Sequence, residues 1–84
     1  MSQKDKLIRK LKSRSKDFTY DEAETLLQYL TFRKDNKGKT SGSRVMFVSE
    51  KYGTILLHKP HLRKELPEYQ IRQLCTKLEQ EGLI

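Results

Sequence analysis

The sequence predicts a small α+β domain in which a three-stranded antiparallel sheet packs against helices. Apolar residues recur at helical spacing in residues 20–30 and 67–78, and short β-type segments lie between these stretches. A segment of hairpin length joins the last two β-type segments. The 84 residues make one domain with a small core. We expect the order helix, helix, three strands, helix, with one sheet face on the helices and the other open to a ligand.

The first expected helix lies in a basic N-terminal segment, residues 1–16. Seven Lys or Arg accompany a single acidic residue there, and Leu7, Ile8 and Leu11 form a short apolar stripe. We interpret this segment as a solvated helix that docks through the three apolar side chains, with a phosphate-contacting arm as the alternative. It extends a main domain formed by residues 17–84.

The second helix carries the clearest start signal in the chain. Thr19 and Glu22 have the spacing of a capping box, in which each side chain accepts a hydrogen bond from the other residue's backbone N–H. Acidic residues in the first turn also suit the positive end of the helix dipole. Four apolar residues follow at helical spacing: Ala23, Leu26, Leu27 and Leu30. The pattern predicts a helix from about Tyr20 to Leu30.

Three strand candidates come next, at residues 31–34, 44–48 and 54–58. The first is the weakest of the three. The segment from Ser49 to Gly53 has hairpin length, and Gly53 is free to adopt a positive φ angle. These segments predict an antiparallel sheet of three strands.

The final helix is bounded by proline and glycine. Pro60 ends the third strand, and Pro67 suits the first turn of a helix, where its missing N–H does no harm. Gly82 is placed to cap the C-terminus of this helix. The stripe between them has i, i+3, i+4, i+7 spacing and consists of Ile71, Leu74, Cys75 and Leu78. We therefore interpret Cys75 as a small apolar core residue rather than a nucleophile.

Positive charge is concentrated in the middle of the chain. Residues 33–64 hold nine Lys or Arg against two acidic residues, a balance of +7 that equals the formal net charge of the whole chain. The other 52 residues carry nine basic and nine acidic side chains. Neutralising phosphates releases condensed counterions, so a polyanion is the partner that this surface favours.

A loop rich in glycine and serine, residues 37–44, lies inside this basic block. It lacks the spacing of a P-loop, and no helix follows it to lend a dipole. Its small residues let a phosphodiester approach the backbone closely, and a flexible, solubilising hairpin loop is the alternative. We predict RNA contacts in this loop for Lys37, Lys39 and Ser43, and elsewhere in the basic block for Lys34, Lys51, Lys59, Arg63 and Lys64.

His58 and His61 are the two histidines of the chain, and imidazole titrates near neutral pH. Two histidines are too few for a structural zinc site, which needs about four ligands, so we expect no metal and no other cofactor. RNA cleavage without a metal needs a group that takes the 2′-OH proton, a group that protonates the leaving 5′-oxygen, and cations that stabilise the phosphorane. Imidazoles suit the first two roles and arginine the third. His58, His61 and Arg44 are therefore the candidate catalytic residues, with a structural role for the histidines as the alternative.

Several other classes of protein are disfavoured. No apolar run approaches membrane-spanning length, and the N-terminus lacks the core of a signal peptide. The single cysteine cannot form an internal disulfide, so a reducing cytoplasm is the expected location. The four tyrosines are scattered and form no stacking run for single-stranded RNA.

Four short segments follow one another in a specific order and spacing. They are Leu30-Thr31-Phe32, Gly42-Ser43-Arg44-Val45-Met46-Phe47, Ile55-Leu56-Leu57-His58-Lys59-Pro60-His61, and Lys64 to Leu74 with the later Glu81 to Ile84. Together they resemble the HicA toxins of bacterial toxin–antitoxin systems, over about residues 17–84. The resemblance implies a fold similar to a double-stranded-RNA-binding domain. It also implies a ribosome-independent endoribonuclease that cuts mRNA and halts growth, and a HicB antitoxin that covers its active site.

The sequence departs from that family at one position. Many HicA toxins carry Gly-Ser followed, directly or after one residue, by a catalytic histidine at the start of the second strand; here the matching residue is Arg44. Arginine stays protonated and is a poor general base. Either Arg44 acts on the phosphate while His61 or His58 transfers the proton, or the protein cuts slowly, or it has lost cleavage. His61 falls where the family has a Pro-Arg-His segment and is the better-matched histidine.

The sequence therefore supports three functions. The first is a HicA-like toxin and metal-independent endoribonuclease that an antitoxin neutralises. The second is a non-catalytic module that binds double-stranded RNA. The third is a basic protein whose partner is an acidic protein.

Overall fold

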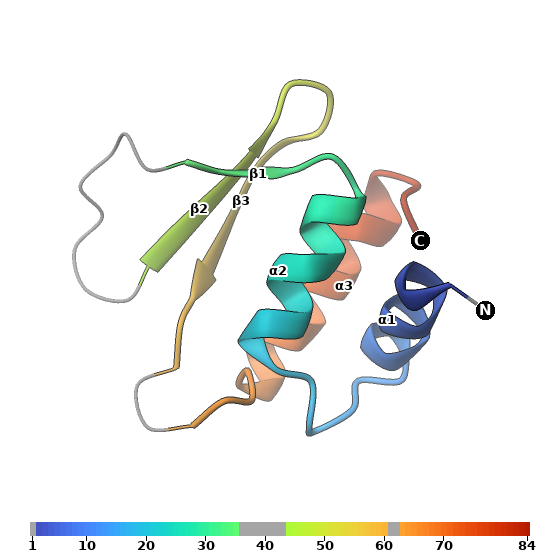
Figure 1. Cartoon of the computed structure of the whole chain (residues 1–84), viewed down its shortest axis with the longest axis vertical. Coiled ribbons are helices and arrows are strands. Elements are labelled where there is room, and N and C mark those ends of the chain that lie inside the picture. Colours follow the sequence, from blue (N-terminus) through green and yellow to red (C-terminus); the bar gives the residue numbers. More distant parts are fainter. Residues whose placement is uncertain (1, 36–43, 61–62) are drawn as a thin grey trace.

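The computed structural model describes residues 2–35, 44–60 and 63–84 and has the expected α+β architecture. Its elements, in chain order, are α1 (Gln3–Lys12), α2 (Tyr20–Tyr29), β1 (Arg33–Asp35), β2 (Arg44–Ser49), β3 (Gly53–His58) and α3 (Glu68–Gln80). Figure 1 shows α2 and α3 in the centre, with the sheet on one side of them and α1 on the other. The predicted order of helix, helix, three strands and helix is confirmed.

The capping box at the start of α2 forms as the sequence predicts. The Thr19 hydroxyl accepts a hydrogen bond from the backbone N–H of Glu22 at 3.1 Å, and the Glu22 carboxylate accepts from the backbone N–H of Thr19 at 3.0 Å. The cap satisfies backbone donors that the helix itself leaves without a partner. Behind it, the stripe of Ala23, Leu26 and Leu27 is fully buried.

The end of α2 differs from the expected start of a strand. The Thr31 N–H donates to the Gln28 carbonyl at 3.1 Å and the Phe32 N–H to the Leu27 carbonyl at 2.9 Å, which are the two bonds of a Schellman motif. The motif puts Thr31 in the left-handed region, at φ 72°, where a β-branched side chain is crowded. The prediction that the first strand begins at Thr31 is therefore wrong, because β1 begins at Arg33.

The hairpin between β2 and β3 sets the register of the sheet. At its start, the Ser49 hydroxyl accepts hydrogen bonds from two backbone N–H groups of the turn at 3.3 Å each. Gly53 closes the turn at φ 88°, so its predicted positive φ is confirmed. From there the antiparallel pairs run from Ser49↔Gly53 to Arg44↔His58, and β1 pairs with the other edge of β2.

Side chains alternate between the two faces of this sheet. Phe47, Ile55 and Leu57 point toward the helices and are buried. Met46 and Leu56 are cross-strand partners on the opposite face, where Leu56 is 44% exposed. The sheet therefore has one face in the core and one that we call the open face.

Helix α1 joins the same core. Leu7 and Leu11 are buried and Ile8 packs partly against the core, so these three side chains dock the helix as expected. The Lys10 ammonium also donates to both carboxylate oxygens of Glu22 at 2.9 Å. An ion pair thus joins α1 to the cap of α2.

The chain ends with the predicted glycine cap. α3 begins directly after Pro67 and ends before Gly82, which has φ 72°. The N–H of Leu83 donates to the carbonyl of Leu78 at 2.9 Å. Leu83 and Ile84 then pack partly against the core.

Replacing Thr31 with glycine should stabilise the protein. Glycine has no Cβ to crowd the left-handed backbone, so Thr31→Gly should raise the free energy of unfolding by about 1 kcal/mol. Chemical denaturation measures this gain. Gln73→Gly, at an exposed position inside α3, is the control and should instead lose about 0.5–1 kcal/mol. Equal losses in both variants would contradict the argument.

The Lys10–Glu22 pair should make stability depend on pH. Burial alone would raise the pKa of the Glu22 carboxyl, but hydrogen bonds from Lys10 and Thr19 outweigh it and hold that pKa below its ordinary value. A carboxylate of this kind contributes stability above its unfolded pKa and loses it as pH falls through its folded pKa. Lys10→Met should lower the free energy of unfolding by about 0.5–1 kcal/mol at neutral pH. The difference from the parent should shrink below about pH 4.

Denaturation curves at several pH values test this expectation. Lys12→Met, which removes an exposed lysine from the same helix, is the control and should change the free energy of unfolding by less than about 0.5 kcal/mol. A loss in Lys10→Met that is the same at neutral and acidic pH would assign the effect to lost packing instead.

Candidate nucleic-acid interface and active site

Arg44 and His58 lie directly opposite each other at one end of the β2–β3 ladder. The His58 N–H points away from β2, because it donates to the side chain of Gln70 on α3 at 2.9 Å. Arg44 and His58 therefore form a non-hydrogen-bonded pair, in which the Cα atoms are about 4.5 Å apart and the side chains are closest. Because Leu57 points into the core, its neighbour His58 projects onto the open face, together with Arg44.

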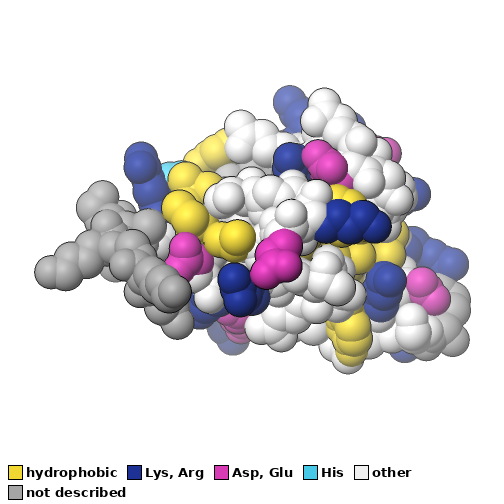
Figure 2. Space-filling view, turned by 90° about the horizontal axis from the view of Figure 1, so that it is seen from above, with side chains coloured by type: hydrophobic (Ala, Val, Ile, Leu, Met, Phe, Trp, Pro, Cys, Tyr) yellow, Lys and Arg dark blue, Asp and Glu magenta, His cyan; other side chains and the backbone are white. Residues whose placement is uncertain are grey.

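This pair borders an apolar surface. Met46 and Leu56 form the next cross-strand pair on the open face. Figure 2 shows a group of hydrophobic side chains on the surface that adjoins a histidine and basic side chains. His58 itself is half-buried. The Arg44–His58 pair thus lies at the border of the apolar part of the open face, at the end of the β2–β3 ladder.

Gln70 fixes the end of β3. Its side chain is 4% exposed, accepts from the His58 N–H at 2.9 Å and donates to the His58 carbonyl at 3.4 Å. A buried amide whose donor and acceptor are both paired is held in one orientation. Helix α3 therefore sets the position of the His58 backbone and, with it, of the imidazole relative to Arg44.

Three predicted RNA-binding residues gather near the start of α2. A small pocket of about 110 Å³ there is lined by Tyr20, Asp21, Lys59, Pro60, Arg63 and Lys64. A backbone hydrogen bond brings the start of α2 next to Lys64, because the Tyr20 N–H donates to the Lys64 carbonyl at 3.0 Å. Lys59 directly follows His58 in the chain, so this basic pocket begins one residue beyond the Arg44–His58 pair.

Tyr20 is the buried aromatic side chain of the basic pocket. It is 5% exposed, and its hydroxyl has no hydrogen-bond partner within the described ranges. Burial, followed by the negative charges of Glu24 and Asp21, raises the pKa of Tyr20 to about 12. The Lys59 ammonium lies 5.7 Å from the centre of the Tyr20 ring, in a cation–π contact. Tyr20 therefore stays protonated at neutral pH and positions Lys59.

Two other predicted RNA-binding lysines lie apart from the Arg44–His58 pair. Lys34 on β1 forms an ion pair with Glu24 on α2 at 3.0 Å, which holds its ammonium on the helix side of the sheet. Lys51 lies in the hairpin turn, and its ammonium is 5.5 Å from the centre of the Tyr52 ring. The length of β2, about 17 Å, separates this turn from Arg44. The structure does not bring either lysine to the candidate site.

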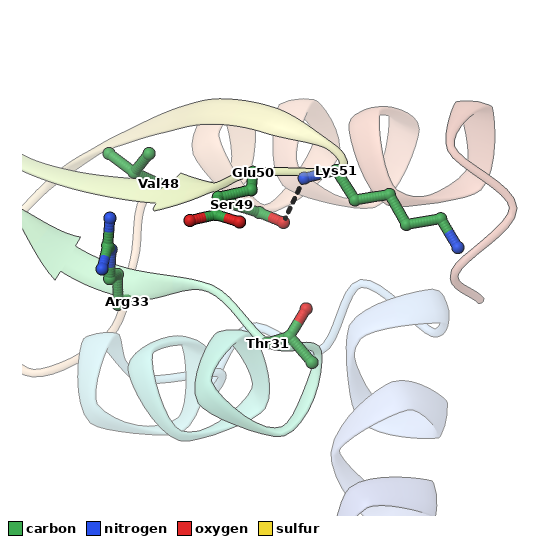
Figure 3. Close-up of a pocket in the computed structure, with 6 residues that line it drawn as sticks. All are labelled: Thr31, Arg33, Val48, Ser49, Glu50 and Lys51. Carbon is green, nitrogen blue, oxygen red and sulfur yellow. Dashed lines mark hydrogen bonds between the residues drawn. The ribbon is translucent and has the colours of Figure 1, made fainter.

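A second pocket, of about 340 Å³, lies at the hairpin end of the sheet. It is lined by Thr31, Arg33, Val48, Ser49, Glu50 and Lys51. Figure 3 shows that the Lys51 side chain points away from this pocket, whereas the carboxylate of Glu50 lies between Arg33 and the turn. A carboxylate in that place opposes a phosphate, because like charges repel. The basic pocket has the carboxylate of Asp21 in its lining but three cations beside it, whereas this pocket has two cations beside Glu50, so the basic pocket suits a phosphate better.

Four predicted site residues lie outside the described residues: Lys37, Lys39, Ser43 and His61. Their roles stay predictions. His61 was the better-matched histidine by resemblance, but the histidine that the structure places against Arg44 is His58.

Gln70 is the site residue that sequence reasoning missed. It lies four residues before Leu74, so helical spacing places it on the apolar stripe of α3. A glutamine on a buried stripe needs hydrogen-bond partners. That conflict between residue type and position is the signal that could have found it.

The remaining reactive side chain is structural. Cys75 is 3% exposed, and burial, followed by the charge of Glu79, raises the pKa of its thiol, which confirms the interpretation of Cys75 as a core residue. Across residues 2–35, 44–60 and 63–84, no three His, Cys, Asp or Glu side chains come together in a way that could hold a metal ion. In the same ranges, no helix is both long and apolar enough to cross a bilayer.

Removing the Gln70 amide should loosen the end of β3. Gln70→Leu leaves the N–H and carbonyl of His58 without partners, so it should cost about 1–3 kcal/mol of unfolding free energy. Gln73→Leu, on an exposed position of the same helix, should stay within about 0.5 kcal/mol of the parent. Hydrogen exchange at the His58 amide should accelerate in Gln70→Leu alone. Unchanged exchange there would contradict the assigned role of Gln70.

A comparison with protein families agrees with this fold. A family model described as the HicA toxin of bacterial toxin-antitoxin matches residues 20–83. The match begins at the first residue of α2 and includes every element except α1. Searches of curated proteins and of solved structures found no match. The chain therefore belongs to the HicA toxin family of bacterial toxin–antitoxin systems.

Proposed function

We propose that this HicA-family toxin is a metal-independent endoribonuclease that cleaves mRNA, arrests growth and is neutralised by a HicB-like antitoxin. One observation carries the proposal: Arg44, at the family's histidine position, lies directly opposite His58 on the open face. An imidazole thus faces the position where the family's histidine is replaced. A permanent cation and a proton-transfer group meet at one place, as metal-free RNA cleavage requires.

The two residues take different roles. His58 accepts the proton of the 2′-OH, and the 2′-oxygen bonds to phosphorus while the bond from phosphorus to the 5′-oxygen breaks. Arg44 donates to the phosphoryl oxygens, whose negative charge grows in the transition state. His61 is the proposed donor of the proton to the leaving 5′-oxygen. The products are a 2′,3′-cyclic phosphate and a 5′-hydroxyl.

The basic pocket provides the grip on the substrate. Lys59, Arg63 and Lys64 line it one residue beyond His58, so they suit a phosphate next to the scissile one. Contacts to the RNA backbone give affinity without sequence preference and weaken steeply as salt rises. Lys37, Lys39 and Ser43, which precede Arg44, are proposed to contact flanking phosphates, whereas Lys34 and Lys51 add to the long-range field.

A second candidate function is binding of double-stranded RNA without cleavage. The observation that favours it is Arg44 itself, because arginine stays protonated and cannot replace the family's general base. In this case the basic pocket and the open face hold RNA, and His58 performs no chemistry.

The family assignment supports a proposed partner and a proposed location. A toxin of this family implies a cognate antitoxin, and the net charge of +7 favours an acidic one. Cleavage of mRNA places the toxin in the cytoplasm. Residues 1–16, which precede the family match, are a proposed extension that stabilises the main domain through Leu7 and Leu11.

Exchanging the two opposed residues tests the proposed pair. Arg44→Ala and His58→Ala should each lower the rate of RNA cleavage by about 10²–10⁴-fold, because each removes one of the two roles. The His58→Arg variant should cleave as slowly as His58→Ala. The double variant Arg44→His, His58→Arg returns an imidazole and a guanidinium to the same cross-strand pair and should restore cleavage. The assay is incubation with a defined RNA in EDTA.

Two further variants and two assay outcomes make the test decisive. Arg72→Ala removes an exposed arginine of α3 and should cleave at the parental rate. His61→Ala separates the histidines, since a larger loss there than in His58→Ala would transfer the role of general base to His61. RNA that the parent binds but leaves intact would support the second candidate function, and cleavage that EDTA abolishes would contradict the acid–base assignment.

A further inference from the structure

Strand β3 is an edge strand whose outer backbone groups point away from the sheet. The strand order is β1-β2-β3, so among the described residues β3 pairs with a strand on one side only. On the other side, the N–H and carbonyl of His58 point outward to Gln70. Such groups alternate along a strand, so those of Thr54 and Leu56 also point outward, where no described residue bonds them. Unpaired edges of this kind accept another strand readily.

A groove runs beside this edge. It has a volume of about 410 Å³ and lies between β3 and α3, where its walls include Leu56, Tyr69, Gln73, Leu74 and Lys77. Leu56, at 44%, and Tyr69, at 55%, are two of the three large hydrophobic side chains that are exposed in the described ranges. Backbone groups that bond an extended chain and pockets that take its alternate side chains are the two parts of a strand-addition site.

Gln70 shows what this edge accepts. Its side-chain amide has the donor and acceptor of a peptide group and bonds both backbone groups of His58, as a residue of a neighbouring strand does. The open positions are therefore Thr54 and Leu56. A strand added there ends at Gln70, next to the Arg44–His58 pair.

We propose that an extended segment of the HicB-like antitoxin adds to β3 as a fourth strand. Its backbone bonds the outward groups of Thr54 and Leu56, and an apolar side chain of the segment enters the groove between Leu56 and Tyr69. This proposal rests on the proposed function, because it names the surface through which the antitoxin binds. The added strand ends beside His58, so the antitoxin body that follows it lies over the Arg44–His58 pair and excludes RNA.

Charge selects an antitoxin over a second copy of this chain. Two copies joined through β3 would bring together two net charges of +7, and their repulsion opposes association. An acidic partner is attracted by the same field. The occupant of the edge is therefore a strand from an acidic protein, with an apolar residue for the groove.

Hydrogen exchange on the complex tests the pairing directly. The probe is the cognate HicB-like antitoxin that the family implies, bound to the full chain. The amides of Thr54 and Leu56 should slow by about tenfold or more in the complex, since each gains a bond. The His58 amide, already bonded to Gln70, should change less. A complex in which Thr54 and Leu56 exchange as in the free toxin would overturn the proposal.

A matched pair of variants tests the same edge through affinity. Thr54→Pro removes the outward N–H, which proline tolerates on an edge strand, whereas Thr54→Ala keeps it. The proline variant should bind the antitoxin about tenfold or more weakly, and the alanine variant within about threefold of the parent. Leu56→Gln, which removes the apolar contact at an exposed position of the groove without changing the charge, should weaken binding as well and covers the case in which Thr54→Pro fails to fold. Parental affinity in the folded Thr54→Pro and Leu56→Gln variants would overturn the proposal.

The outcomes separate this inference from the proposed function. The antitoxin could inhibit RNA cleavage while the amides of Thr54 and Leu56 exchange as in the free toxin. That result would support the proposed function and contradict the added strand. If these amides exchange more slowly in the free toxin as its concentration rises, the edge binds a second copy of the toxin. That result would overturn the inference. If the parent protein does not cleave RNA, the proposed endoribonuclease activity is contradicted. The hydrogen-exchange result then still decides whether the antitoxin binds along β3.

Discussion

The bond pair between the Gln70 side chain and the His58 backbone is the contact on which the candidate site depends. It joins α3 to the end of β3, and so decides where the imidazole lies across from Arg44. Gln70 is itself placed by the first turn of α3, where its N–H donates to the Pro67 carbonyl at 3.0 Å. The segment before that helix is tied to the segment before α2, because the Leu66 N–H donates to the Phe18 carbonyl at 2.9 Å. The site is thus supported by a chain of hydrogen bonds, of which those of Gln70 to His58 come from its side chain, rather than by packing alone.

Local signals predicted most of the fold. The capping box, the apolar stripes and the glycine turns act over a few residues, so one sequence suffices to find them. The position of Arg44 opposite His58 was also within reach, since pairing Ser49 with Gly53 and counting outward along both strands gives it. The start of β1 could not be predicted in this way. Phe32 is buried, and the centroid of its ring lies 6.2 Å from that of the stacked Tyr52 ring. This contact between residues distant in sequence accompanies the left-handed turn before β1.

Charge counting could not tell which cations are available. Lys10, Lys34 and Lys59 count equally toward the net charge, yet each contacts a different kind of partner in the fold. Lys10 bonds the carboxylate of Glu22, Lys34 pairs with Glu24, and Lys59 lies over the Tyr20 ring in the basic pocket. The partners come from elements distant in sequence, so the division between structural and ligand-facing lysines is a property of the tertiary structure.

The same edge links neutralisation to catalysis in the proposed mechanism. Gln70 and the hairpin already fix both ends of β3, so a strand added along its outer edge finds a rigid template and has little reason to distort it. The antitoxin then acts by covering the Arg44–His58 pair rather than by deforming it. A toxin held in this way keeps its working geometry throughout, and release of the antitoxin restores activity without a folding step. Neutralisation by distortion would instead require the loss of bonds that the Gln70 amide makes in the free toxin.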